Sequence, residues 1–174
     1  MAGDTICRAG VEDAERLSAL SARTFTETFG HLYVPEDLAD YLATAYTVEK
    51  QRRILADPAW GVWLLERDGG AIGYIVAGPC GLPHPDVGEG DGEIKRLYLV
   101  QGAQGAGGGT RLMQVAMDWL LRDGPRTLWV GVWSENHGAQ RFYQRWGFTR
   151  AGEYLFPVGK ARDLEFILRR PAQA

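Results

Sequence analysis

Cysteine is scarce in this chain, whose 174 residues contain only Cys7 and Cys80. Two widely separated cysteines argue against a disulfide framework or a zinc site, so we expect no metal and a reducing, cytoplasmic location. Long apolar runs are also lacking, because none reaches the roughly 18 residues that a membrane span needs. The N-terminus has no basic segment followed by an apolar one, so no secretory signal is expected.

An excess of positive charge is missing as well. The chain has 19 basic and 22 acidic residues, a net charge of -3, and no basic cluster that could neutralise phosphates. We therefore expect neither nucleic acid nor a membrane as a partner. With 45% hydrophobic and 24% charged residues, the composition is that of a globular protein. The length fits a single domain over residues 1–174 with a core of its own.

The spacing of apolar residues predicts the order of helices and strands. Helices are expected over 11–22, 24–29, 35–45, 48–56, 110–122 and 136–146. Strands are expected over 5–9, 61–67, 71–77, 127–132, 148–158 and 163–168, with a further one from Glu93 onward. A loop rich in proline and glycine covers 78–92. This order implies one α/β (α+β) domain built around a mixed sheet of about seven strands with flanking helices.

The most informative segment is the glycine-rich turn that follows the strand from Glu93. A strand, a glycine turn and a helix together direct main-chain N–H groups at a phosphate. A Walker loop is excluded because no lysine follows Gly109, and a dinucleotide fingerprint is excluded because Thr110 replaces its third glycine. The remaining pattern is Gln-x-x-Gly-x-Gly at Gln104, Gly107 and Gly109. A flexible loop without a ligand is the alternative.

A second segment, Trp129 to Phe148, contains Asn136 at the expected start of a helix and the pattern Phe-Tyr-x-x-x-Gly-Phe. In this order and at this distance, the two segments resemble the acetyl-CoA site of the GCN5-related N-acetyltransferase (GNAT) family. Shorter segments, such as Phe25 to Phe29 and Glu36 to Leu42, resemble the spermidine/spermine acetyltransferase branch of this family. The resemblance implies a mixed, mostly antiparallel sheet with splayed central strands, and acetyl-CoA as cosubstrate.

The resemblance also implies which residues bind CoA. The main chain of the turn would hold the pyrophosphate, through Gln104, Gly105, Ala106, Gly107, Gly108, Gly109 and Thr110. The pantetheine arm would be bound by the main chain of the preceding strand at Leu97, Tyr98 and Leu99. The side chain of Asn136 would make a further contact with it. Arg145 could meet the phosphates, although a surface arginine is the alternative. Gly108 stands where the family usually has a larger apolar residue, which predicts a looser loop.

Two catalytic residues follow from the same resemblance. Tyr143 is expected to protonate the departing thiolate, and its chemistry allows this because a phenol of pKa ~10 can supply a proton to a thiolate whose thiol is near ~8.5–10. Glu93 is expected to take the proton of the acceptor amine, often through water. The alternatives are a tyrosine that only packs and a solvated acid at a strand end. Strict alternation along the strand predicts Glu93, Leu97 and Leu99 on one face.

The acceptor is expected to be a primary amine of a small molecule, preferably a polyamine such as spermidine or spermine. An alkyl amine is mostly protonated near neutral pH, so acidic groups would bind it and then remove a proton. The candidates lie in the 78–92 loop and the N-terminal helices, at Asp86, Glu89, Asp91, Glu27, Glu36, Asp37 and Asp40. The alternatives are a protein N-terminus or lysine as acceptor, a CoA-binding regulatory module without catalysis, and a binder of another nucleotide. Both a monomer and a homodimer are compatible with the sequence.

Overall fold

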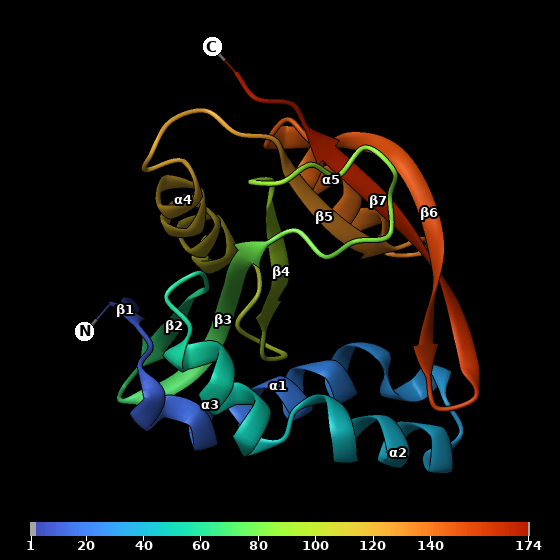
Figure 1. Ribbon diagram of the computed structural model, residues 1–174. Coiled ribbons are helices and arrows are strands. Elements are labelled where there is room, and N and C mark those ends of the chain that lie inside the picture. The colour runs from blue at the N-terminus through green and yellow to red at the C-terminus, as the bar shows by residue number, and fades with distance from the viewer. Residues whose placement is uncertain (1–2, 174) are drawn as a thin grey trace.

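The computed structural model describes residues 3–173 and forms one seven-stranded sheet covered by helices on both faces (Figure 1). The strands are β1 Thr5–Arg8, β2 Gly61–Arg67, β3 Gly70–Pro79, β4 Gly92–Leu99, β5 Leu128–Trp133, β6 Thr149–Val158 and β7 Ala161–Arg170. The helices are α1 Ala14–Phe29, α2 Pro35–Ala45, α3 Val48–Ala56, α4 Gly108–Leu120 and α5 His137–Arg145, with 3₁₀ turns at Val11–Asp13 and Gly30–Leu32. The α/β fold expected from the sequence is confirmed. No helix of the described residues is both long and apolar enough to cross a membrane.

The strand order β1-β2-β3-β4-β5-β7-β6 contains a single parallel contact, between β4 and β5. This contact is short, because Gly92–Ile94 pairs with Leu128–Val130 and the two strands separate beyond these residues. The expected splay of the central strands is therefore present. It leaves an opening in the middle of the sheet, with one unpaired strand edge on each side.

The helices divide between the two faces of the sheet. The apolar sides of α4 and α5 pack on one face, around Leu112, Ala116 and Tyr143. The helices α1, α2 and α3 cover the other face, where Leu17 and Phe25 are buried. Figure 1 shows the long β6–β7 hairpin reaching down to the end of α2, and there the Lys160 main-chain N–H donates to Asp37 Oδ1 at 3.0 Å. The hairpin and the N-terminal helices thus enclose one side of the opening.

Several helix boundaries differ from those predicted, and two differences are informative. The helices expected over 11–22 and 24–29 form one helix, α1, which begins at Ala14 after the 3₁₀ turn and continues through Arg23, whose side chain forms an ion pair with Glu27 at 3.4 Å. The helix α4 begins at Gly108, two residues before Thr110. Gly107 precedes it with a φ of 84°, a left-handed conformation that glycine adopts without steric strain.

A bulge in β4 makes the predicted alternation wrong. Ala77 of β3 pairs with Ile94 and Val76 pairs with Arg96, so Lys95 is an extra residue on β4. Beyond the bulge the faces exchange, and Ile94 lies in the same core as Leu97 and Leu99. Glu93 instead shares its face of the sheet with Arg96 and Tyr98, and all three line one cavity. The bulge therefore collects polar side chains of β4 on the side of the N-terminal helices.

Candidate active site

The glycine-rich turn presents a row of free main-chain donors. Its backbone turns through left-handed conformations at Gly102, Gly105 and Gly107, with φ of 90°, 86° and 84°. No N–H group of residues 104–110 donates a hydrogen bond to any residue from 3 to 173. Because α4 starts inside this segment, its first N–H groups and its positive dipole end add to the donors. The turn has the geometry of an anion site.

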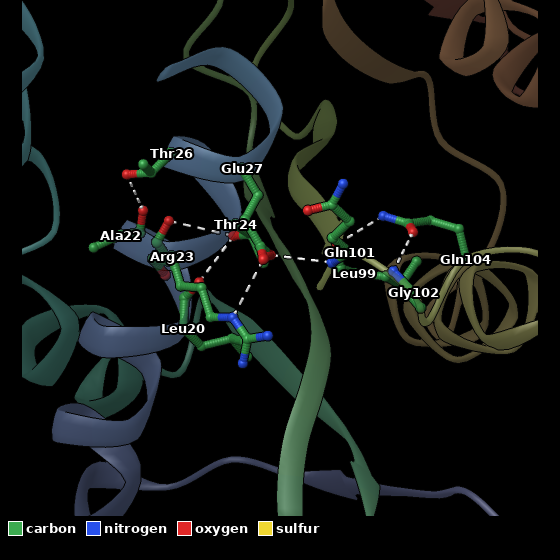
Figure 2. Close-up of polar contacts among 11 residues, drawn as sticks. Leu20, Ala22, Arg23, Thr24, Thr26, Glu27, Leu99, Gln101, Gly102 and Gln104 are labelled. Carbon is green, nitrogen blue, oxygen red and sulfur yellow. Dashed lines mark hydrogen bonds and ion pairs between the residues drawn. The ribbon is translucent and has the colours of Figure 1, made fainter. Parts of the chain in front are cut away.

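Side chains on both sides hold the turn in place (Figure 2). Glu27 of α1 accepts a hydrogen bond from the Gln101 main-chain N–H at 3.0 Å. Gln104 folds back over its own loop, accepting from the Gly102 N–H at 3.1 Å and donating to the Leu99 carbonyl at 3.1 Å. The Gln104 side chain thus supports the turn, and its main-chain N–H remains free.

Gly108 is buried and packs closely rather than leaving a gap. A Cβ at this position would lie 2.5 Å from Leu65 Cδ2 and 3.1 Å from Leu99 Cδ2. Those two leucines fill the space that a larger residue would take, which is a physical reason to correct the expectation of a looser loop. Arg111 points away from the turn, since its guanidinium donates to the Asp4 carbonyl at 2.9 Å.

The opening between β4 and β5 is a narrow cavity of about 60 Å³. Leu97 and Tyr98 line it from β4, on the edge that β5 leaves unpaired. Asn136 lines it from the start of α5, and its side chain caps that helix by accepting from the Ala139 N–H at 3.1 Å. Arg145 is exposed at the other end of α5, with its guanidinium 5.8 Å from the centre of the Phe142 ring.

Tyr143 of α5 also lines this narrow cavity. Only 7% of the residue is exposed, yet its hydroxyl makes no hydrogen bond within residues 3–173. Burial, and secondly the negative charge of Glu165, raise the pKa of Tyr143 well above the ordinary 10. The phenol therefore keeps its proton at neutral pH, and the raised pKa makes it a weaker acid than a free tyrosine.

A larger cavity of about 310 Å³ lies beside the narrow one, on the side of the N-terminal helices. Most of its lining is aromatic, with contributions from α1, α2, the sheet and the β6–β7 hairpin that include Phe25, Tyr41, Trp60, Tyr98, Trp133 and Tyr154. Its acidic groups are Glu93, Asp163 and Glu165. An aromatic cavity with carboxylates suits a cation, because ring faces and negative charges both attract it.

Glu93 lies in the wall of the larger cavity and is 7% exposed. Its Oε1 accepts from the Gly81 main-chain N–H at 2.9 Å and lies 2.9 Å from Lys95 Nζ. The expected acid is thus in the site, with one oxygen already occupied. The negative charge of Glu93 is balanced by a neighbour on the same strand.

Glu165 and Asp163 of β7 belong to the site but escaped the sequence analysis. Glu165 lines both cavities. Burial, and then the charge of Asp163, raise the pKa of Glu165 from 4.5 to about 7. Asp163 accepts a hydrogen bond from the Tyr33 hydroxyl. The signal in the sequence was two acids at alternate positions, Asp163 and Glu165, which share one face of a strand.

The other acids considered as candidates lie outside the two cavities. Asp91 accepts from Trp129 Nε1 at 2.8 Å, Glu27 supports the glycine turn, and Asp37 holds the β6–β7 hairpin. Glu89 is exposed on the 78–92 loop. Asp91, Glu27 and Asp37 therefore stabilise loops around the site. None of these acids lies where it could bind an amine in either cavity.

Comparison with known proteins agrees with this geometry. Residues 15–148 match the family model described as the acetyltransferase (GNAT) family. The chain belongs to the GNAT family of acetyltransferases. It is 31% identical to an uncharacterized N-acetyltransferase of Lactobacillus delbrueckii subsp. lactis, over 98% of either chain. It is 30% identical to one from Mycobacterium tuberculosis strain H37Rv, over 91% of this chain and 97% of the relative. This GNAT protein is accordingly an acyltransferase.

Solved structures show the same GNAT fold. The PaiA N-acetyltransferase from Thermoplasma acidophilum, crystallised in complex with coenzyme A, superposes with a TM-score of 0.77 at 18% identity. That match covers 98% of this chain and 99% of the other. The ribosomal-protein-S18-alanine N-acetyltransferase from Escherichia coli has a TM-score of 0.68 at 18% identity, over 99% and 96% of the two chains. At these identities the likeness concerns the fold alone.

Proposed function

We propose that this GNAT protein transfers the acetyl group of acetyl-CoA to a primary amine of a small molecule. The observation that carries the proposal is the connection of three features: free N–H groups at residues 104–110, a narrow cavity between β4 and β5, and a larger acidic and aromatic cavity beyond it. A pyrophosphate fits the first, a thin pantetheine arm the second, and a cationic amine the third. The solved relative with bound coenzyme A supports the choice of donor.

The turn and the splayed strands would hold CoA. The main chain of residues 104–110 binds the pyrophosphate, and the open edge of β4 at Leu97–Leu99 hydrogen-bonds the pantetheine amides, with Asn136 opposite. Arg145 contributes at most from the periphery, since it is exposed at the far end of α5.

In the chemical step, the amine nitrogen attacks the thioester carbonyl and the sulfur departs as a thiolate. We assign the protonation of that thiolate to Tyr143, whose hydroxyl is buried, protonated and free of other partners. Before attack, the ammonium form of the amine must lose a proton. We assign Glu93 to this step through water, as the resemblance implies, because its carboxylate lines the larger cavity.

A polyamine is the preferred acceptor within this class. Three carboxylates and a largely aromatic wall favour a substrate with more than one positive charge and aliphatic segments between the charges. Two cations also line this cavity: Lys95 is paired with Glu93 at 2.9 Å, and Arg96 is hydrogen-bonded to the neutral Ser21 and Gln51. The three carboxylates therefore leave the lining with one net negative charge when all are ionised.

Thiol release from acetyl-CoA, measured with the purified protein, tests the function. The acceptor panel comprises spermidine, spermine, short alkyl diamines, amino acids, and peptides with a free N-terminus or a lysine. Turnover with the small amines supports the proposal. Turnover with peptides alone would show that the acceptor is a protein amine and not a small molecule. Calorimetric binding of CoA without turnover of any acceptor would instead indicate a regulatory module.

A further inference from the structure

The carboxyl group of Glu165 occupies the point where the two cavities meet. It comes from the middle of β7, where its neighbours across the sheet are Trp133 of β5 and Tyr154 of β6. It lines both the narrow cavity with Tyr143 and the larger aromatic cavity. An acceptor amine must reach this junction to meet a thioester, so Glu165 lies where the reacting nitrogen would arrive.

The strand β5 leaves room beside this carboxyl. Gly131 stands next to it, and a Cβ on Gly131 would lie 3.6 Å from Glu165 Oε2 and 3.3 Å from the Tyr154 hydroxyl. A side chain at this position would narrow the junction. The absence of one keeps Oε2 within reach of a small ligand group.

Glu165 differs from Glu93 in how its charge is balanced. Glu93 uses one oxygen for both Lys95 and the Gly81 N–H, and it lines only the larger cavity. The Glu165 carboxylate makes no hydrogen bond or ion pair with any residue between 3 and 173. A largely buried carboxylate without a partner gains the most from an incoming cation, because its desolvation is otherwise uncompensated.

The surroundings of Glu165 contain two cations of β4, Lys95 and Arg96, and neither forms an ion pair with its carboxylate among residues 3–173. The negative charge of Glu165 contributes to the raised pKa of five tyrosines around it, and the charge of Asp163 contributes to the raised pKa of Glu165 itself; the tyrosines are Tyr33, Tyr41, Tyr98, Tyr143 and Tyr154. Lys95 and Arg96 line both cavities with Glu165, whereas Glu93 lines only the larger one. Lys95 is paired with Glu93, and Arg96 donates to Ser21 Oγ at 3.1 Å and to Gln51 Oε1 at 2.8 Å.

We propose that Glu165 binds the ammonium group of the acceptor at the junction and takes its proton directly. This inference rests on the proposed function and deepens it, since it gives the amine a defined position and transfers the removal of its proton from Glu93 to Glu165. Glu93 then remains a second carboxylate of the larger cavity that attracts the cation. It also restricts the acceptor to amines that are cationic when they bind. The aromatic rings around the junction add attraction for the same cation.

Each proton that the acceptor amine loses has an acceptor in this reaction. One ammonium proton moves to Glu165, and the freed lone pair of nitrogen forms the C–N bond at the thioester carbonyl. As the C–S bond breaks, sulfur takes the proton of Tyr143, and the second proton of nitrogen restores the phenol. Glu165 then releases its proton to solvent. A pKa of about 7 suits this cycle, because the group can both accept and release a proton near neutral pH.

The test compares Glu165→Gln with Glu93→Gln, and with Glu89→Gln on the exposed loop as the matched control. For the best amine of the panel, kcat/KM is measured from about pH 5.5 to about pH 9. The wild-type value should rise through about pH 7, where Glu165 loses its proton. Glu165→Gln should lower it by ~10²–10⁴ and abolish that rise, whereas Glu93→Gln should keep the rise.

Calorimetry makes the result independent of turnover. Spermidine should bind the CoA complex of the wild type and of Glu89→Gln, and Glu165→Gln should weaken that binding by about tenfold or more. A Glu165→Gln variant with the wild-type pH profile and amine affinity overturns the inference and leaves the proposed function intact. A wild type that releases no thiol with any acceptor refutes the proposed function, and the calorimetric comparison still decides the role of Glu165. Absence of amine binding to the wild type refutes both.

Discussion

Replacing Glu165 by Gln is expected to stabilise the fold at neutral and alkaline pH. Burial raises the pKa of this carboxyl from 4.5 to about 7, so the folded state keeps a proton that the unfolded state has lost. The wild type therefore loses stability as the pH rises from about 4.5 to about 7, and the full cost is present above that range. At about 1.4 kcal/mol per pKa unit, the cost amounts to about 3 kcal/mol. Gln has nearly the same shape and carries no charge to desolvate.

Urea unfolding at about pH 4.5 and about pH 8 measures this effect. The free energies of unfolding of Glu165→Gln and wild type should be similar at the lower pH. At the higher pH the variant should be more stable by about 3 kcal/mol, or by roughly 6–12 °C in Tm. Glu89→Gln controls for the loss of one negative charge. If the difference between variant and wild type is the same at both pH values, the carboxyl is not desolvated and the reasoning fails.

Three further changes test the rest of the site. Tyr143→Phe should lower kcat by ~10²–10⁴ with little change in CoA affinity, and an effect within about threefold would exclude the general-acid role. Glu27→Ala removes the acceptor of the Gln101 N–H, which should raise the KM for acetyl-CoA by about five- to tenfold at an unchanged amine KM. Gly131→Ala should reduce kcat/KM for the amine by roughly tenfold, since its Cβ crowds Tyr154 and Glu165. Steady-state kinetics with each substrate varied in turn measures all three.

If Glu165→Gln gains stability and loses activity, the two results together support a catalytic role for Glu165. A misfolded or loosened Glu165→Gln protein would lose both activity and stability. The reasoning from burial predicts opposite signs, because the cost of holding an unpaired carboxylate in the folded state is the same property that makes it attract an ammonium. The pair of measurements thus separates a functional role from a structural one.

The candidate CoA-binding residues are the part of the site for which the sequence contains local signals. The glycine-rich turn is contiguous, and its backbone requires left-handed glycines at 105 and 107 and then the start of a helix. The cap at Asn136 is equally local, since it bonds the N–H three residues on. Short-range patterns of this kind are readable without knowledge of the tertiary fold. The roles assigned to these residues stay predictions until they are measured.

The amine-facing half could not be predicted in the same way. Glu165 enters the site because β7 inserts between β5 and β6, a pairing that depends on tertiary structure. The period-2 pattern of β4 failed because the bulge at Lys95 is not encoded by any turn residue nearby. Sequence spacing therefore placed Glu93 on the wrong face relative to Leu97, whereas the family resemblance had indicated the residue itself.

The bulge in β4 and the separation of β4 from β5 both determine which groups of β4 a substrate can reach. Had β4 continued beside β5 past Ile94, the edges of both strands would be bonded to each other and closed to a ligand. Had β4 kept strict alternation, Arg96 and Tyr98 would point into the α4 core instead of the cavity that holds Glu93. The extra residue at Lys95 thus turns polar side chains toward an acceptor. The separation of β4 from β5 leaves a strand edge open for an acyl donor.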